Sequence, residues 1–420
     1  MALDESSGEF EEAVSSWTSQ FEKKGRDLLE KAHSWELYEQ TLATGLYPYF
    51  QALDENQGPV ARYQGREVLM FGSNNYLGLT THPKVREAAI QAIQKYGTSM
   101  TGSRFLNGTL TLHEELEGRL ARFLGKEAAL VFTTGYQANL GMLTALFNRH
   151  SIAVVDKYAH ASVHDGCRLM EGESRPFRHN DIQDAERVLS DIPSDQGAML
   201  IADGVYSMEG DIAPLPGLVA LARKFKVRIA IDDAHGLGVM GPGGRGTVHH
   251  FGLENQVDLL VGTFSKSLAS IGGFVAADKK VIDFMKHFGR PMIFSASLAP
   301  SCTAAAMAAL EVLEAEPERP AQVRANTRRL LGGLREIGYE TGEAPAAVVP
   351  VIIGDSIKTF MIWKELQDEG VYTNPVLFPA VPKGREMLRV SCLATHTPAH
   401  LDKGLEIFRK VAKNYDIGTR

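Results

Sequence analysis

Short apolar runs alternate with amphipathic segments from about residue 60 to residue 300. The clearest runs are 129–132, 152–155, 199–202, 228–231 and 259–261. Their hydrophobicity is continuous rather than alternating, which is typical of strands buried on both faces. Such strands form mostly parallel sheets covered by helices. The pattern therefore predicts an α/β fold with ligands beyond the carboxyl ends of the strands, where most of these runs end in Gly, Asp, Ser or Thr.

The pattern changes on either side of this region. Residues 8–45 are charged and helix-prone, with aromatic residues and leucines at roughly helical spacing. After residue 300, an alanine-rich helix candidate leads into further strands and helices. We therefore predict an N-terminal helical arm (1–60), a large α/β domain (61–300) and a smaller C-terminal α/β domain (301–420). The arm could equally pack on its own domain or take part in a contact between subunits.

Composition narrows the classes of function. The chain has 420 residues, 44% of them hydrophobic, and a net charge of −7, without the basic excess of a nucleic-acid binder. Its cysteines (Cys167, Cys302 and Cys392) are far apart, which favours a reducing intracellular compartment. No apolar run approaches the roughly 20 residues that span a bilayer. We expect a cytoplasmic protein, and a peripheral contact with the inner face of the membrane stays open.

Lys266 follows the buried run 259–261, within the segment Val261-Gly-Thr-Phe-Ser-Lys-Ser267. A lysine at the end of a buried strand is costly unless it has a partner or a chemical task. We interpret Lys266 as the lysine that forms an imine with pyridoxal 5′-phosphate (PLP), with Thr263 and Ser265 on the phosphate. The alternative is a lysine that points into water.

Gly135 stands where the run 129–132 passes into a helix candidate. Free backbone N–H groups at a helix start, together with the helix dipole, form an anion site, and glycine lets the backbone approach a phosphate closely. A tight turn without a ligand is the alternative. The segment is neither a Walker A loop nor a dinucleotide-binding fingerprint.

Asp232 and His235 follow the run 228–231. A carboxylate near a pyridine nitrogen keeps that nitrogen protonated, so that the ring can withdraw electrons. We assign Asp232 to this role and His235 to a hydrogen bond with the phenolic oxygen of the cofactor. A helix N-cap aspartate beside a structural histidine would look the same in sequence.

Two further sites lie after strands or within them. His160 follows the run 152–155 and is placed to stack on an aromatic ring. His160 and His164 have the i, i+4 spacing of a metal pair, but no third ligand has suitable local spacing, and we expect no metal. Arg389 lies in an apolar strand, so we expect a carboxylate partner, which could be an internal Asp or Glu or the carboxylate of a substrate.

Together these segments resemble the α-oxoamine synthases, PLP enzymes of fold type I, over nearly the whole chain. The resemblance rests on SNNYLGL at 73–79, TGSRFLNGT at 101–109, TGYQANLG at 134–141, HAS at 160–162, DxAHGLG at 232–238, GTFSKS at 262–267 and RVS at 389–391. It implies a PLP site built from Gly135, Tyr136, His160, Ser207, Asp232, His235, Thr263, Ser265 and Lys266. It also implies a homodimer in which Ser295 reaches the phosphate of the partner subunit, and an amino-acid site at Asn74 and Arg389.

Within the family, the resemblance implies a condensation of L-serine with palmitoyl-CoA or another long-chain acyl thioester, which is the first step of sphingolipid synthesis. The pointers are Phe264 and Ser265 beside the lysine, and the segments 207–211, 294–298 and 374–382. Leu377 and Phe378 stand where some relatives carry an arginine. Three alternatives are a member that uses glycine or alanine, a non-catalytic regulatory subunit, and a dehydrogenase, which the missing dinucleotide fingerprint disfavours.

Overall fold

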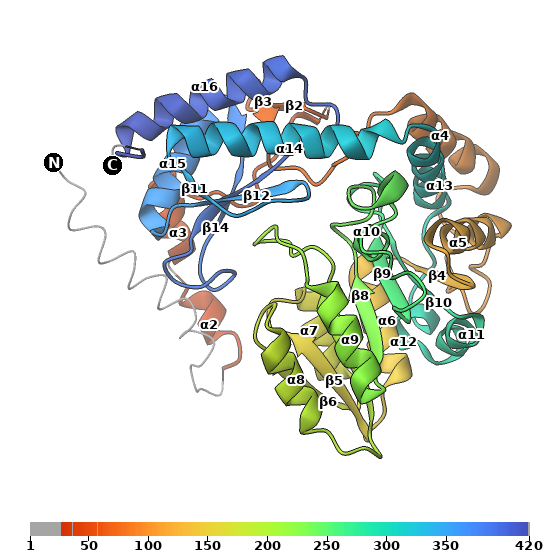
Figure 1. Ribbon diagram of the computed structural model, residues 1–420. Coiled ribbons are helices and arrows are strands. Elements are labelled where there is room, and N and C mark those ends of the chain that lie inside the picture. Colours follow the sequence, from red (N-terminus) through yellow and green to blue (C-terminus); the bar gives the residue numbers. More distant parts are fainter. Residues whose placement is uncertain (1–26, 36, 57, 419–420) are drawn as a thin grey trace.

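The computed structural model describes residues 27–418 except 36 and 57. Figure 1 shows a central sheet with its helices beside a second body that contains the C-terminus. In the described part of the predicted N-terminal arm the chain forms α2 (Glu30–His33) and α3 (Leu37–Ala43). The rest of the predicted arm helix, including Trp17 and Phe21, lies outside the described residues.

The central sheet has seven strands and confirms the predicted mostly parallel arrangement. Its order is β4 (Ala128–Phe132), β10 (Gly273–Ala277), β9 (Leu259–Thr263), β8 (Arg228–Asp232), β7 (Gly197–Asp203), β5 (Ser151–Asp156) and β6 (Glu173–Phe177). Only β10 runs antiparallel to its neighbours in this sheet. The connection from Thr263 to Gly273 is too short for a parallel crossover, so the chain must return antiparallel.

Helices cover both faces of this sheet, which explains why its strands are hydrophobic throughout. Leu260 belongs to one buried core, while Leu259 and Val261 belong to the core on the opposite face. The covering helices are α4 (Pro83–Tyr96), α5 (Thr111–Leu124), α6 (Gly135–Leu146), α7 (Ala161–Leu169), α8 (Ile182–Ser190), α9 (Leu215–Phe225), α10 (Thr247–His250), α11 (Lys279–Phe288), α12 (Arg290–Ile293) and α13 (Pro300–Ala315).

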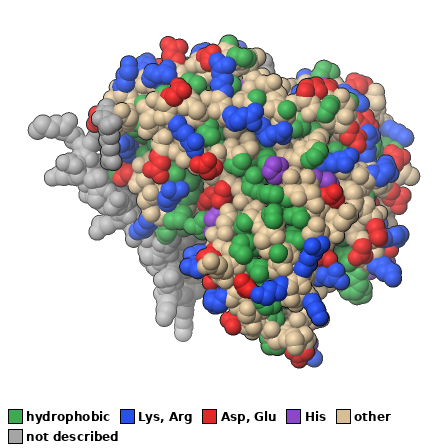
Figure 2. All heavy atoms as spheres, viewed as in Figure 1, with side chains coloured by type: hydrophobic (Ala, Val, Ile, Leu, Met, Phe, Trp, Pro, Cys, Tyr) green, Lys and Arg blue, Asp and Glu red, His purple; other side chains and the backbone are tan. Residues whose placement is uncertain are grey.

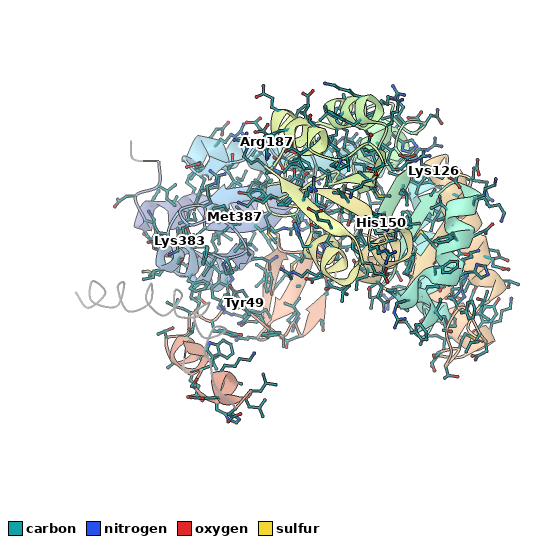
Figure 3. The ribbon with its side chains drawn as sticks, turned by 90° about the horizontal axis from the view of Figure 1, so that it is seen from below. Tyr49, Lys126, His150, Arg187, Lys383 and Met387 are labelled. Carbon is teal, nitrogen blue, oxygen red and sulfur yellow. The ribbon has the colours of Figure 1, made fainter. Side chains whose placement is uncertain are left out.

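The C-terminal body is built on an antiparallel sheet of β11 (Glu340–Thr341), β12 (Val348–Ile352), β15 (Met387–Ser391) and β14 (Asn374–Val376). It is packed with α14 (Glu318–Ile337), α15 (Ser356–Asp368) and α16 (Pro398–Asn414). In Figure 3, Lys383 and Met387 lie in this body, far from Lys126 and His150 of the central-sheet body.

A small third sheet joins the two ends of the chain. It consists of β1 (Glu55–Asn56), β2 (Val60–Tyr63), β3 (Arg66–Met70) and β13 (Val371–Tyr372), and β3 pairs in parallel with β13. Leu69, Phe71 and Tyr76 accordingly pack in the core of the C-terminal body. The domain boundaries predicted at residues 60 and 300 remain a proposal. The pairing of β3 with β13 indicates in addition that β2 and β3 belong with the C-terminal body.

Charges of both signs are interspersed over the face seen in Figure 2, without a large patch of a single sign. Among the residues that the structure describes, no helix combines the length and the apolarity needed to cross a bilayer.

Candidate active site

A cavity of about 260 Å³ lies at the carboxyl ends of β7, β8 and β9. Most of the residues predicted to hold the cofactor line it, namely Gly135, Tyr136, His160, Asp232, His235, Thr263, Ser265 and Lys266. The structure thus brings together side chains from segments more than 100 residues apart. Ser207, Ser295, Asn74 and Arg389 do not line this cavity, and their places are described below.

Lys266 lies three residues after β9 and is the only lysine among the described residues that line the cavity. Burial lowers the pKa of its amine to about 8, against the opposing effect of the Asp232 carboxylate. Near neutral pH this amine therefore loses its proton far more easily than an ordinary lysine, as a nucleophile or a proton carrier requires.

Two carboxyl groups lie opposite each other at the ends of neighbouring strands. Asp203 on β7 and Asp232 on β8 are partners in the sheet register, and both are buried. Asp232 accepts hydrogen bonds from Asn139 Nδ2 (2.6 Å) and the N–H of Ala234 (3.1 Å). Burial and the Asp232 charge raise the pKa of Asp203 well above its ordinary value. The raised pKa favours the neutral acid at Asp203.

His160 is the N-cap of α7, and its ring is held in one tautomer. The N–H of Ser162 (3.3 Å) and the Ser162 hydroxyl (2.8 Å) both contact Nδ1. Because a backbone N–H can only donate, Nδ1 is the acceptor and the ring proton is on Nε2. Burial lowers the pKa of His160 despite the nearby Asp232, so the ring is neutral at neutral pH.

His235 is buried, and its Nδ1 lies 2.7 Å from the hydroxyl of Tyr76. Burial and the neighbouring Lys266 and Arg389 charges hold the pKa of His235 well below its ordinary value. The single hydroxyl proton of Tyr76 has two acceptors in reach, Asn74 Oδ1 (3.1 Å) and His235 Nδ1 (2.7 Å). When it goes to Nδ1, a neutral His235 carries its own proton on Nε2 and can donate it to an oxygen. Sequence reasoning did not find Tyr76.

The start of α6 has the features of an anion site. Thr134 caps the helix by accepting the N–H of Gln137 (3.0 Å), while the N–H groups of Gly135 and Tyr136 have no acceptor within the described chain. A Cβ at Gly135 would stand 2.9 Å from Thr263, so only glycine allows this approach. Thr263 and Ser265 add two hydroxyl groups 2.8 Å apart. Ser295 is close by, where its hydroxyl accepts from Gln137 Nε2 of the same chain (2.9 Å).

Arg389 lies on β15, is buried, and forms no ion pair with any carboxylate of the described residues. Its Nε donates to the carbonyl of Ser207 at 2.6 Å, and its other nitrogens lie 3.4 Å from the hydroxyls of Tyr76 and Ser391. Asn74 joins the group through a 3.1 Å contact with the Tyr76 hydroxyl. Of the two interpretations of this arginine, the internal carboxylate partner is therefore wrong for the described part of the chain.

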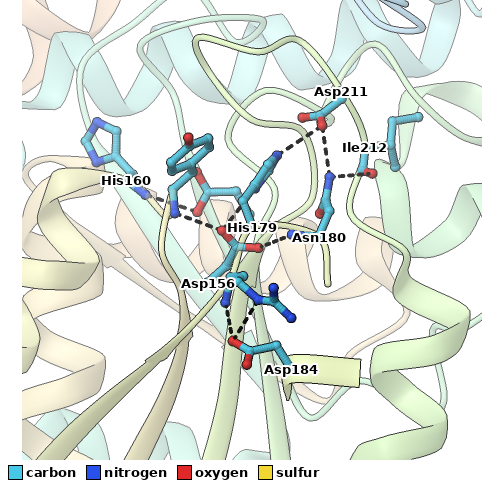
Figure 4. Close-up of polar contacts among 10 residues, drawn as sticks. Asp156, His160, His179, Asn180, Asp184, Asp211 and Ile212 are labelled. Carbon is cyan, nitrogen blue, oxygen red and sulfur yellow. Dashed lines mark hydrogen bonds and ion pairs between the residues drawn. The ribbon is translucent and has the colours of Figure 1, made fainter. Parts of the chain in front are cut away.

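His179 contacts Asp211 in the loop that carries Ser207, and Figure 4 shows this contact as a dashed line. The two ring nitrogens of His179 each lie 3.0 Å from a carboxylate, Asp156 at the end of β5 and Asp211 in the loop. Burial opposes the charge on this ring, but the bonds to Asp156 and Asp211 raise the pKa of His179 to about 9. An imidazolium thus bridges two carboxylates, and one of them, Asp211, belongs to the loop whose Ser207 carbonyl accepts from Arg389.

The arrangement fits PLP. The α6 start and the two hydroxyl groups suit a phosphate, Asp232 suits a pyridinium nitrogen, His235 suits a phenolic oxygen, and Lys266 provides the amine. His160 lines the cavity wall, where its ring can face an aromatic system. No cluster of three or more His, Cys, Asp or Glu suited to a metal ion occurs in the part of the chain that the structure describes.

Comparison with known proteins agrees with this geometry. The family model for aminotransferases of class I and II matches residues 66–408, so the chain belongs to that family. It is a PLP-dependent acyltransferase of fold type I, in the α-oxoamine synthase branch.

The relatives narrow the class further. The chain is 44% identical over 394 residues to a serine palmitoyltransferase of Sphingobacterium spiritivorum (94% of this chain, 98% of the relative) and 46% identical over 390 residues to that of Bacteroides ovatus (93% and 99%). A solved structure of SPT with a PLP internal aldimine superposes with a TM-score of 0.91 at 37% identity (93% and 100%). Four 8-amino-7-oxononanoate synthases are 37–40% identical.

Proposed function

We propose that this chain condenses L-serine with palmitoyl-CoA, or another long-chain acyl thioester, to give 3-ketodihydrosphingosine, CoA and CO2. The observation that carries the amino-acid half is Arg389, a buried guanidinium without an internal carboxylate among the described residues. An unpaired buried charge is costly, so a ligand carboxylate is its natural partner. Identity of 44–46% to serine palmitoyltransferases supports serine as the amino acid.

Each candidate residue has a role that follows from its surroundings. When bound, PLP withdraws electrons from the α-carbon of the amino acid. Lys266 holds the cofactor and moves the proton at that carbon, for which a pKa of about 8 is suited. His160 donates from Nε2 to the substrate carboxylate, while Arg389 and Asn74 bind and orient that carboxylate.

We further propose that the protein works as a homodimer with shared active sites, in which Ser295 also serves the phosphate of the partner subunit. A cytoplasmic location with peripheral contact to the membrane would suit a long-chain acyl substrate. The nearest rivals are glycine C-acetyltransferase, 8-amino-7-oxononanoate synthase and 5-aminolevulinate synthase, which would share the PLP residues and differ in substrate.

Titration of the holoenzyme with L-serine, glycine and L-alanine, followed by product analysis with palmitoyl-CoA and acetyl-CoA, tests the proposal. We expect L-serine to change the PLP absorbance at the lowest concentration and palmitoyl-CoA to give 3-ketodihydrosphingosine. A matched variant, Arg389→Lys, keeps the charge but loses the bidentate fork, and it should raise the KM for L-serine about tenfold or more. A preference for glycine or alanine over L-serine, or for acetyl-CoA over palmitoyl-CoA, would contradict the proposal.

A further inference from the structure

The ring of His179 is enclosed by four side chains from two turns. Its nitrogens lie 3.0 Å from Asp156, at the end of β5, and 3.0 Å from Asp211, in the loop between β7 and α9. The Tyr158 ring stacks on it at 4.5 Å between centroids, and the Tyr206 ring meets it edge to face at 4.4 Å. A ring with both polar atoms bonded and aromatic contacts on two sides has little freedom to move.

The first turn runs from Asp156 to His160. The Asp156 carboxylate accepts the N–H of Tyr158 (2.8 Å), and the Asp156 carbonyl accepts the N–H of Ala159 (3.0 Å). His179 thus contacts both Asp156 and Tyr158, the residues that shape this turn. A displacement of either residue would therefore shift His160 at the start of α7.

The second turn runs from Tyr206 to Asp211 and carries Ser207. The N–H of Tyr206 donates to the carbonyl of Asp211 (3.0 Å), and the N–H of Gly210 donates to the carbonyl of Tyr206 (3.0 Å). The Ser207 carbonyl accepts from Nε of Arg389 at 2.6 Å. Because the turn is closed by its own backbone bonds, a displacement of Asp211 would also shift the carbonyl that meets Arg389.

Asn180 attaches to the same two carboxylates. Its N–H donates to Asp156 and its Nδ2 donates to Asp211, both at 2.9 Å, and Figure 4 shows these bonds beside those of His179. The two turns therefore stay joined when His179 is replaced, and we expect such a variant to fold. What the variant loses is the ring that packs between the turns.

We propose that His179 is a positioning residue for the carboxylate of the amino-acid substrate. It fixes the turn of His160 on one side and, on the other side, the turn that meets Arg389. This inference rests on the proposed function, in which His160 and Arg389 bind that carboxylate. His179 does not line the cavity at Lys266, so it acts only through the two turns. The contacts of His179 described above do not reach β8 or β9, so its loss should spare the cofactor.

The experiment compares L-serine with ethanolamine, which is L-serine without its carboxylate. Each is titrated into the holoenzyme, and the change in the PLP absorbance gives its Kd. His179→Gln should raise the Kd of L-serine about tenfold, as expected when hydrogen bonds to a charged group are displaced. It should change the Kd of ethanolamine less than about twofold, because this ligand has no carboxylate to position. A histidine that only stabilises the fold would change the two Kd values alike.

A second variant, Asp211→Ala, separates the two turns because it releases the turn of Ser207 and leaves Asp156 in place. It should raise the Kd of L-serine about threefold or more and leave that of ethanolamine within about twofold. When it is added to His179→Gln, the Kd of L-serine should change less than about twofold further, because the same contact is lost in both variants. If His179→Gln fails to bind PLP, Asp211→Ala decides by the same comparison.

His113 provides a matched control. It is also buried and bonded at both ring nitrogens, to the N–H of Leu110 (3.0 Å) and the carbonyl of Leu298 (2.9 Å), and neither partner belongs to the two turns. His113→Gln should therefore leave the ratio of the two Kd values unchanged.

Equal weakening of L-serine and ethanolamine in His179→Gln, or the same change of the ratio in His113→Gln, overturns the proposal. Failure of the proposed function looks different. If the wild type prefers glycine or L-alanine, the proposed substrate is wrong, and methylamine or ethylamine replaces ethanolamine in the same test of His179. If the wild type binds no amino acid better than the matching amine, the carboxylate site at Arg389 is wrong, and this inference fails with it.

Discussion

At the scale of single residues, the site depends on a division of charge between Asp203 and Asp232. Their positions in register on β7 and β8 place two buried carboxyl groups side by side, and both cannot be ionised without strong repulsion. Asn139 and the Ala234 N–H donate to Asp232. Asp203, whose pKa is raised well above its ordinary value, accepts the N–H of His160 (3.3 Å).

This division predicts opposite outcomes for two matched substitutions. Asp203→Asn resembles the neutral acid that is already present, and it should retain kcat/KM within about threefold. Asp232→Asn removes the charge expected opposite the pyridine nitrogen, and it should lower kcat/KM by about a hundredfold or more. Steady-state kinetics and the PLP dissociation constant measure both effects. Similar large losses in the two variants would contradict the assignment.

The residues of the site differ in how far the sequence could reveal them. Asp232, His235 and Lys266 stand directly after apolar runs, so the end of a buried strand marks them. Asp203 stands after the run 199–202 in the same way, so the same signal marks it. Tyr76 and His179 could not be found, because their roles depend on contacts with residues more than 20 positions away, such as Tyr76 with His235 and His179 with Asp156.

At the scale of elements, the loop between β7 and α9 connects the two bodies. His179 contacts Asp211 of this loop, and the carbonyl of Ser207 accepts from Arg389 of β15. Met208 of the same loop packs beside Val376, Val381 and Met387. Leu377, the residue after Val376, is also buried. Arg389, which we propose to bind the substrate carboxylate, is therefore contacted by a loop of the other body.

His179 should make the stability of the protein depend on pH in a defined direction. Its pKa rises from 6.5 when unfolded to about 9 in the fold, so its contribution is complete below pH 6.5 and is lost as the pH rises through about 9. Replacement by Gln should lower the free energy of unfolding by about 3 kcal/mol at pH 6.

Urea unfolding at several pH values measures this difference, which should shrink between pH 6.5 and about 9. The exposed His150 provides the control, because His150→Gln should cause no comparable change. A difference for His179→Gln that stays constant over the same pH range would show that the charge is unimportant.

The elements themselves were predictable where hydrophobicity was continuous. The predicted strands became β4, β5, β7, β8 and β9, and the alanine-rich helix became α13. β6, with the sequence Glu-Ser-Arg-Pro-Phe, is a polar edge strand and lacks that signal. The pairing of β3 with β13 joins residues about 300 positions apart, which no local pattern can predict.

At the scale of the whole molecule, the segment 71–79 links the two bodies. Phe71 and Tyr76 pack in the C-terminal core, while Leu77 and Leu79 pack in one core of the central sheet. The hydroxyl of Tyr76 contacts both Nδ1 of His235 and a guanidinium nitrogen of Arg389. A shift between the bodies would thus change the distance between the residues proposed to hold the cofactor and Arg389, which we propose to bind the substrate carboxylate.

The proposed homodimer also concerns the surface of the whole molecule. Phe105, Leu106 and Phe294 are 51%, 77% and 73% exposed, and exposed apolar groups of this size mark interaction surfaces. Their loops are joined, because the N–H of Ser297 donates to the carbonyl of Gly102 (2.9 Å). These residues lie near Ser295, which contacts Gln137 at the phosphate end of the cavity. A second subunit that covers this surface would therefore also border the cofactor site.

Leu106→Glu should convert the dimer to a monomer, because it places a charge in a surface that the partner would bury. Light scattering at several concentrations measures the mass, and Leu106→Ile, which keeps the apolar character, should remain dimeric. If Ser295 acts across the interface, the monomer should also bind PLP about tenfold more weakly, as expected from losing a hydrogen bond to a charged group. A Leu106→Glu dimer with unchanged PLP affinity would place the subunit contact elsewhere on the molecule.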